Sequence, residues 1–247
     1  MSLIEAARPA PGRRAPHCVP GSIVAVTFLA ALTARSLAVA GTLRQGTEWD
    51  LLRDDDGIQT YRRTLPDRGA AAIRAVAMVD APIAKVATVI VDTSRRVEWF
   101  PGLAEARVVR EIGSGGRLEY WRMRMPIGFA EREFHVRASV EYDVNRVRLH
   151  AVSVSDPAFP VPAHVLATIR ECEYTLSPVS ADRTMVELIV DADPGGHVPS
   201  VMVHVFQHRN VRRNLEGLRR QSARTDIGTA PEIAEVDHHA DGLGRDP

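Results

Sequence analysis

Apolar and polar residues alternate through residues 58–65 and again through residues 70–79, which is the period of a half-buried β-strand. The segment between them, residues 66–69, reads Pro-Asp-Arg-Gly and is typical of a turn. Residues 54–57, three aspartates and a glycine, predict another turn just before the first strand. The folded part of the chain is therefore expected to open with a hairpin.

A helical period follows Asp80. Apolar side chains now recur every three or four residues, at Ile83, Val86, Ala87, Ile90 and Val91. Pro82 can occupy the first turn of this helix, because its missing N–H would have no partner there. Residues 92–99 predict a second short helix that ends before Pro101.

Six further stretches have the character of strands: residues 104–112, 117–125, 131–142, 147–155, 167–176 and 184–192. Short links at residues 113–116 and 143–146 indicate antiparallel neighbours. Residues 155–164 contain three prolines and are expected to form a loop, since proline cannot donate to a sheet.

The last predicted element is a long helix from Pro199 to about Arg224, after the break at residues 193–196. Its predicted apolar stripe consists of Met202, Val205, Phe206, Leu215 and Leu218. Residues 225–247 are polar, acidic and without an apolar period, and we expect them to be disordered.

These elements predict an α+β fold. A twisted antiparallel sheet must bury one face, and the terminal helix is its natural cover. A curved sheet wrapped around a single helix leaves space between the two layers, which favours an internal hydrophobic cavity.

Residues 1–40 have the features of an export signal. Arg13 and Arg14 precede a 13-residue apolar run at residues 22–34, and Ala38-Val39-Ala40 is the small-x-small pattern that predicts cleavage before Gly41. The run is short for a membrane span; a retained membrane anchor is the alternative. The folded domain is expected at residues 41–224, in the periplasm or secreted.

Charge and cysteine content exclude several classes. The chain has 31 Lys and Arg against 31 Asp and Glu, and this zero net charge argues against a nucleic-acid partner. The two cysteines are Cys18 and Cys172, so a mature chain would keep one free thiol. A cysteine-rich zinc site is excluded, because such a site needs several ligands at short spacing.

The order of elements and five short motifs together resemble the START family, the steroidogenic-acute-regulatory-related lipid-transfer domains. The motifs are Trp49-Asp50-Leu51, Asp56-Gly57-Ile58, Glu98-Trp99, Arg132-Glu133-Phe134 and the run from Asp193 to Pro199. The resemblance extends from about Trp49 to Arg220. It implies a helix-grip fold that binds one lipid and has no catalytic activity or cofactor of its own.

Two departures from the family pattern affect ligand specificity. This chain has Cys172-Glu173-Tyr174 where many members have Gly-Trp or a similar pair. Some members also carry a buried acidic-basic pair on the central strands. The corresponding positions here lie near Trp121 and Ala138, so the pair is expected to be absent.

Strand alternation supplies the expected ligand-binding residues, with two from the last helix. They are Trp121, Met123, Met125, Phe134, Val136, Ala138, Leu149, Ala151, Cys172, Tyr174, Met202 and Val205. For any one of these, ordinary core packing is the alternative interpretation. The proline-rich loop is expected to gate the cavity, with Phe159 at its centre.

Other chemistry receives little support. His204 and His208 have the spacing of metal ligands, but the glutamate of the HExxH motif is missing and no metal is expected. The chain contains neither a Gly-x-Ser-x-Gly elbow nor a Walker loop. We therefore expect a monomeric, non-enzymatic carrier of a lipid or sterol that touches a membrane transiently. An aromatase/cyclase-type helix-grip enzyme and a ligand-free interaction domain are the alternatives.

Overall fold

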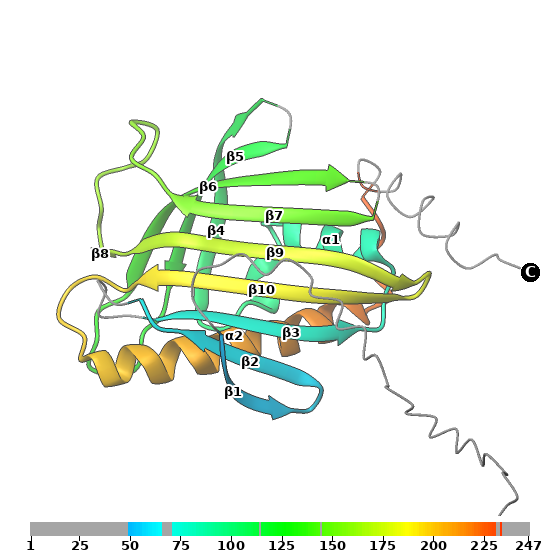
Figure 1. Cartoon of the computed structure of the whole chain (residues 1–247). Coiled ribbons are helices and arrows are strands. Elements are labelled where there is room, and N and C mark those ends of the chain that lie inside the picture. Colours follow the sequence, from blue (N-terminus) through cyan, green and yellow to red (C-terminus); the bar gives the residue numbers. More distant parts are fainter. Residues whose placement is uncertain (1–48, 66–70, 114, 144, 231–232, 234–247) are drawn as a thin grey trace, which may run out of the picture. The chain divides into compact units, whose positions relative to one another are not determined.

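The structure, a computed structural model, describes residues 49–65, 71–113, 115–143, 145–230 and 233 (Figure 1). The predicted signal segment lies outside this part of the chain. Nine of the described strands form one continuous antiparallel sheet in the order β1-β2-β3-β10-β9-β7-β6-β5-β4, and the short strand β8 (Val165–Leu166) pairs with β6 in parallel. The nine strands are β1 (Asp50–Asp55), β2 (Ile58–Arg63), β3 (Ala72–Val79), β4 (Leu103–Ile112), β5 (Gly116–Met123), β6 (Arg132–Asp143), β7 (Arg146–Ser153), β9 (Thr168–Ser180) and β10 (Arg183–Asp193).

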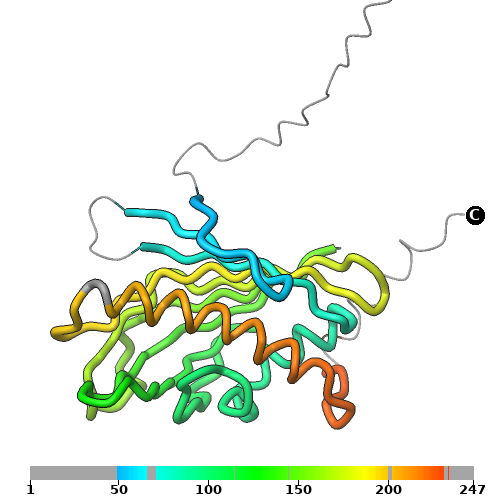
Figure 2. The backbone as a smooth tube through the Cα atoms, turned by 90° about the horizontal axis from the view of Figure 1, so that it is seen from below, coloured from blue at the N-terminus to red at the C-terminus, as the bar shows by residue number. Residues whose placement is uncertain are grey.

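Helix α2 (Ser200–Ser222) lies across one face of this sheet, and the shorter α1 (Ile83–Val91) packs beside it (Figure 2). Pro82 and Pro199 are the N-cap residues of the two helices, close to where the sequence placed their starts. The predicted α+β helix-grip architecture is therefore confirmed. The second short helix, expected over residues 92–99, is only a 3₁₀ turn, Arg96–Glu98.

Strand β1 was not predicted. Asp54 and Asp55 pair with Gln59 and Ile58 in a hairpin, so the turn is confined to Asp56 and Gly57, whose φ angles are 52° and 65°. β1 occupies an edge of the sheet and is exposed along almost its whole length. Without a buried face it has no alternation of apolar and polar residues to reveal it.

The main core lies between the inner face of the sheet and the two helices. Its members are alternate residues of the strands together with the buried faces of the helices, including Val86 of α1 and Leu215 and Leu218 of α2. Gly217 of α2 faces the backbone of Trp99 so closely that a β-carbon at this position would overlap the Trp99 carbonyl oxygen. Glycine here lets the helix pack directly on the chain that follows η1 (Arg96–Glu98).

The prediction of a disordered tail is wrong for its first residues. Ile227, Ala230 and Ile233 pack against the main core, and Ile233 is fully buried. The backbone N–H of Ala230 donates to Thr88 Oγ1 of α1 at 2.9 Å. Isolated apolar residues in a polar segment show no period, yet three of them are enough to hold the segment against α1.

Candidate functional site

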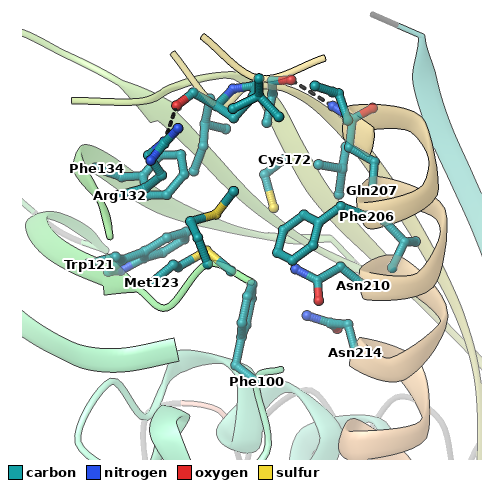
Figure 3. A pocket seen from close by; sticks show the side chains of 18 of the residues that line it. Phe100, Trp121, Met123, Arg132, Phe134, Cys172, Phe206, Gln207, Asn210 and Asn214 are labelled. Carbon is teal, nitrogen blue, oxygen red and sulfur yellow. Dashed lines mark hydrogen bonds between the residues drawn. The ribbon is translucent and has the colours of Figure 1, made fainter. Parts of the chain in front are cut away.

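A cavity of about 120 Å³ lies between α2 and the inner face of the sheet; we call it the main cavity (Figure 3). On the sheet side its wall contains Trp121 and Met123 of β5, Phe134 of β6, and Cys172 and Tyr174 of β9. All five lie at alternate strand positions and point inward, as strand geometry requires. All five are among the residues predicted from sequence to bind the ligand, and the structure places them in a cavity wall.

Helix α2 forms the opposite wall. Its lining residues follow one face of the helix: Met202, Val203, Phe206, Gln207, Asn210, Val211 and Asn214. Of the two α2 residues predicted from sequence, Met202 belongs to this face. Val205 does not, because it is 61% exposed on another side of the helix. The spacing of the apolar residues had left the rotation of the helix ambiguous, and the buried face includes three amide side chains.

One end of the main cavity is formed by two irregular segments. Met125, Pro126 and Phe129 come from the β5–β6 loop, whereas Pro194 and Val198 come from the segment before α2. Arg132 joins the two segments. Its side chain is buried and donates hydrogen bonds to the carbonyl oxygens of Ala130, Pro194 and Gly195.

These contacts give a physical reason for two of the motifs noted above. Arg132 is the first residue of one motif, and the carbonyl groups of Pro194 and Gly195 belong to the other, the run from Asp193 to Pro199. No acidic side chain within the described ranges forms an ion pair with Arg132, and burial lowers the pKa of its guanidinium. Carbonyl dipoles therefore stabilise the charge.

A second cavity of about 40 Å³ is lined by residues of the same core. It accounts for three further predicted residues, Ala138, Leu149 and Ala151, which line it. Phe100 and Trp121 border both cavities, and their rings are in tilted contact with centroids 6.1 Å apart. Val136 is fully buried but borders neither cavity, so ordinary core packing is the correct interpretation for this residue.

A buried charge cluster lies beside the second cavity. Glu119 of β5 is fully buried and accepts hydrogen bonds from Arg96, Arg117, Thr93 and the indole N–H of Trp121. Burial alone raises the pKa of Glu119, but the charges of Arg96 and Arg117 and the hydrogen bonds from Arg96 and Thr93 outweigh it and hold that pKa below its ordinary value.

The chain therefore has a buried acidic-basic pair, but its partners are Glu119 and Arg96 and not two central-strand residues near Trp121 and Ala138. The acid lies two residues before Trp121 on the same inward face of β5, so strand alternation could have located it. Its main partner, Arg96, comes from the 3₁₀ turn, which alternation cannot reveal.

Burial determines the protonation state of the polar groups of Cys172 and Tyr174. Burial raises the pKa of the Cys172 thiol to about 12 and that of the Tyr174 phenol well above its ordinary value. Both groups therefore stay protonated at neutral pH. The Tyr174 hydroxyl donates to Asn214 Oδ1 at 2.7 Å, which ties β9 to α2 across the core.

Phe159 does not lie at the main cavity. Its ring stacks on His135 with centroids 4.3 Å apart, in a small cluster with Leu118 and Tyr120. His135 and Tyr120 alternate with the inward residues Phe134 and Trp121, so this cluster lies on the opposite face of the sheet. Glu133 fastens the loop there by accepting hydrogen bonds from the backbone N–H groups of residues 163 and 164. This position contradicts the expectation that Phe159 gates the cavity.

His208, the second of the two histidines with metal-ligand spacing, lies next to a threonine of β2. His208 Nε2 lies 3.0 Å from Thr60 Oγ1, and burial together with the positive charges of Arg53 and Arg212 holds its pKa below the ordinary value. Within the residues that the structure describes, no group of three or more His, Cys, Asp or Glu side chains is placed to hold a metal ion. The described helices include none that is both long and apolar enough to cross a membrane.

Comparison with known proteins gives a clear similarity. The family model for the START domain matches residues 30–224. The bovine (Bos taurus) phosphatidylcholine transfer protein is 25% identical over 166 residues, covering 64% of this chain and 76% of its own length. An uncharacterized protein of Pseudomonas aeruginosa is 23% identical over 198 residues, covering 80% of this chain and 96% of that protein.

Two solved structures share the fold. Human StAR-related lipid transfer protein 5 superposes with a TM-score of 0.67 at 17% identity, covering 72% of this chain and 88% of that one. The STAR-related lipid transfer protein of Xanthomonas axonopodis superposes with a TM-score of 0.64 at 22% identity, covering 71% of this chain and 99% of that one.

Proposed function

The chain belongs to the START domain family, and from this premise we propose that it binds one hydrophobic small molecule, a lipid or sterol, in the main cavity and carries it without altering it chemically. The observation that carries the proposal is the lining of the cavity, in which aromatic, aliphatic and sulfur-containing side chains predominate. Apolar burial then supplies most of the affinity, at about 25 cal/mol per Å² before the costs of binding are subtracted.

The size of the cavity implies that loading requires movement. A volume of about 120 Å³ is close to that of an engineered apolar cavity of ~150 Å³ that accommodates benzene, and a whole lipid needs several times more space. We propose that this movement takes place at the end formed by the β5–β6 loop and the start of α2, where two irregular segments border the cavity. Ile127, Met202 and Val205 are exposed apolar side chains there, and we propose that they touch the membrane when lipid enters or leaves.

The purified protein should carry a lipid in stoichiometric amount. Organic extraction followed by mass spectrometry will identify its class. An empty extract, with no uptake from a panel of lipids and sterols, would contradict the carrier function. Conversion of a bound hydrophobic compound into product would instead indicate an enzyme on the same scaffold.

A Cys172→Phe substitution tests whether the main cavity is the binding site. The Cys172 side chain points into the cavity (Figure 3), so a phenyl ring would occupy much of the available space. We expect the extracted lipid to fall about tenfold or more, whereas the melting temperature should stay near that of the wild type because the ring enters existing space. Cys172→Ala is the matched control and should keep its lipid. A Cys172→Phe protein that still carries one lipid per chain would place the ligand elsewhere.

We also propose that the protein acts in the periplasm or outside the cell. The support is the arrangement at residues 13–40, where two arginines, an apolar run and a small-x-small site follow one another. Cell fractionation of the native host should find the protein outside the cytoplasm, and amino-terminal sequencing should read from Gly41. Recovery of the intact chain in the cytoplasmic fraction would contradict export, and an intact chain in the membrane fraction would indicate a retained anchor.

A further inference from the structure

Three amide side chains interrupt the apolar wall of the main cavity: Gln207, Asn210 and Asn214 of α2. Positions separated by three and seven residues share one face of a helix, and Figure 3 shows Asn210 and Asn214 projecting toward the cavity. We call these three residues the amide stripe. Polar side chains are costly beside an apolar space unless they find hydrogen-bond partners, so the partners of each amide decide what the stripe can do.

The Gln207 side chain has one hydrogen-bond partner among the described residues, and its oxygen has none there. Its Nε2 donates to the Ala192 carbonyl oxygen at 2.7 Å, and this bond distinguishes the nitrogen of the amide from its oxygen. The side chain is 9% exposed, and its buried Oε1 accepts no hydrogen bond from any described residue. A buried carbonyl oxygen in this state favours a donor from a bound molecule.

The other two amides leave donors available. Asn214 Oδ1 is occupied by the Tyr174 hydroxyl, which leaves the amide N–H groups of Asn214 unused by that bond. Asn210 forms no side-chain hydrogen bond with the described part of the chain and borders the cavity. The amide stripe therefore presents an acceptor and several donors but no formal charge.

We propose that the amide stripe selects a hydrophobic ligand bearing an uncharged hydroxyl or amide group, whose O–H or N–H donates to Gln207 Oε1. This inference rests on the proposed function of the main cavity and specifies its ligand class. A hydroxyl can also accept from Asn210, so one group satisfies two members of the stripe. An ionised carboxylate or phosphate offers only acceptors and would be repelled by Gln207 Oε1, and a pure hydrocarbon would leave that oxygen unpaired.

A competition experiment separates this selectivity from lipid binding itself. The protein is incubated with phosphatidylcholine vesicles that contain equal amounts of 1-hexadecanol and its methyl ether, then separated and extracted. The two probes have the same chain and differ in the O–H donor. We expect the extract to contain the alcohol in about tenfold excess over the ether, because the ether cannot supply the hydrogen bond.

Variants then assign the preference to the stripe. Gln207→Leu should bring the ratio of alcohol to ether close to one. Asn210→Leu breaks no internal hydrogen bond and should lower the ratio about threefold or more, so it tests the stripe even if Gln207→Leu fails to fold. Gln59→Leu makes the same chemical change on β2, outside the cavity lining, and should keep the wild-type ratio.

The outcomes are distinct. An alcohol-to-ether ratio near one in the wild type overturns the inference but not the carrier function. That result is expected if Gln207 Oε1 accepts a hydrogen bond only from water. A ratio that stays high in both amide variants, or retrieval of phosphatidylcholine in preference to the alcohol, also overturns it. If the wild type takes up no lipid at all, the proposed function fails as well.

Discussion

Replacing Glu119 by glutamine is expected to lower the free energy of unfolding by about 3–5 kcal/mol at neutral pH, the range for a buried ion pair that loses one partner. Glu119 is fully buried and is the counter-charge for both Arg96 and Arg117. Glutamine keeps the shape but removes the charge, and its amide N–H groups would face the donors that now point at the carboxylate. The buried Arg96 guanidinium would then lose its counter-charge, and the partly exposed Arg117 would lose the same partner.

The pH dependence gives a second signature. The pKa of Glu119 in the folded protein lies below its ordinary value of 4.5, so its contribution to stability is complete above about pH 4.5 and is lost as the pH falls toward the folded-state pKa. Urea unfolding measures the free energy of unfolding of the wild type and of Glu119→Gln. The difference between these two free energies should be constant near neutral pH and become smaller below about pH 4.5.

Glu187 provides the matched control. It forms an ion pair with Arg74 at 2.6 Å, but both side chains are more than a quarter exposed. Glu187→Gln should cost about 1 kcal/mol or less, because exposed pairs contribute little. If both variants lost the same free energy of unfolding, burial would not explain the contribution of the Glu119 cluster to stability. A difference that does not narrow in acid would contradict the pH argument.

The Glu119 cluster should also affect the ligand site. Glu119 holds the Trp121 indole through its N–H at 2.6 Å, and the Arg96 guanidinium lies 5.0 Å from the centre of the Trp121 ring. Trp121 borders both cavities, so a weakened cluster would loosen their shared wall. Arg96 also donates to the Ile90 carbonyl oxygen at 2.9 Å and so connects this wall to α1.

Replacing Gly217 by alanine is expected to destabilise the protein by about 3 kcal/mol, the upper range for overpacking. In an exposed helix the same change would stabilise by ~1 kcal/mol, since glycine is a poor helix former. Here the new methyl group would meet the backbone of Trp99, which cannot rotate away as a side chain can, and the carbonyl carbon would lie only 3.1 Å from it. Helix α2 and the Trp99 segment must therefore separate.

Gly228→Ala is the control for Gly217→Ala, because apart from its two chain neighbours no described residue has an atom within 4 Å of a β-carbon at that position. Its free energy of unfolding should stay within about 0.5 kcal/mol of the wild type. Denaturant unfolding at neutral pH measures both variants. A stabilised Gly217→Ala protein would mean that α2 does not pack on the Trp99 backbone. Phe100, which follows Trp99, lines the main cavity, so lipid uptake should fall together with stability.

Local periodicity in the sequence was sufficient for most of the architecture. The alternation on β5 correctly separated the inward residues Trp121 and Met123 from Tyr120 and Arg122, because successive strand side chains must point to opposite faces. The starts of both helices were predictable from Pro82 and Pro199, since proline is tolerated only where a helix begins. The backbone imposes these rules within a few residues of chain, so they are readable without tertiary contacts.

Features that depend on contacts between distant segments were not readable in this way. β1 is a strand because it pairs with β2, although nearly all of its side chains face solvent. Glu119 pairs with Arg96, which lies 23 residues earlier in the sequence. Phe159 stacks on His135 at the outer face of the sheet.

The same limit applies to the ligand site. The helical spacing of apolar residues could not decide whether Val205 or the amide stripe of α2 faces the cavity. The rotation of α2 is set by Gly217 against Trp99 and by Tyr174 bonding Asn214, contacts that exist only once the sheet and the helix have come together.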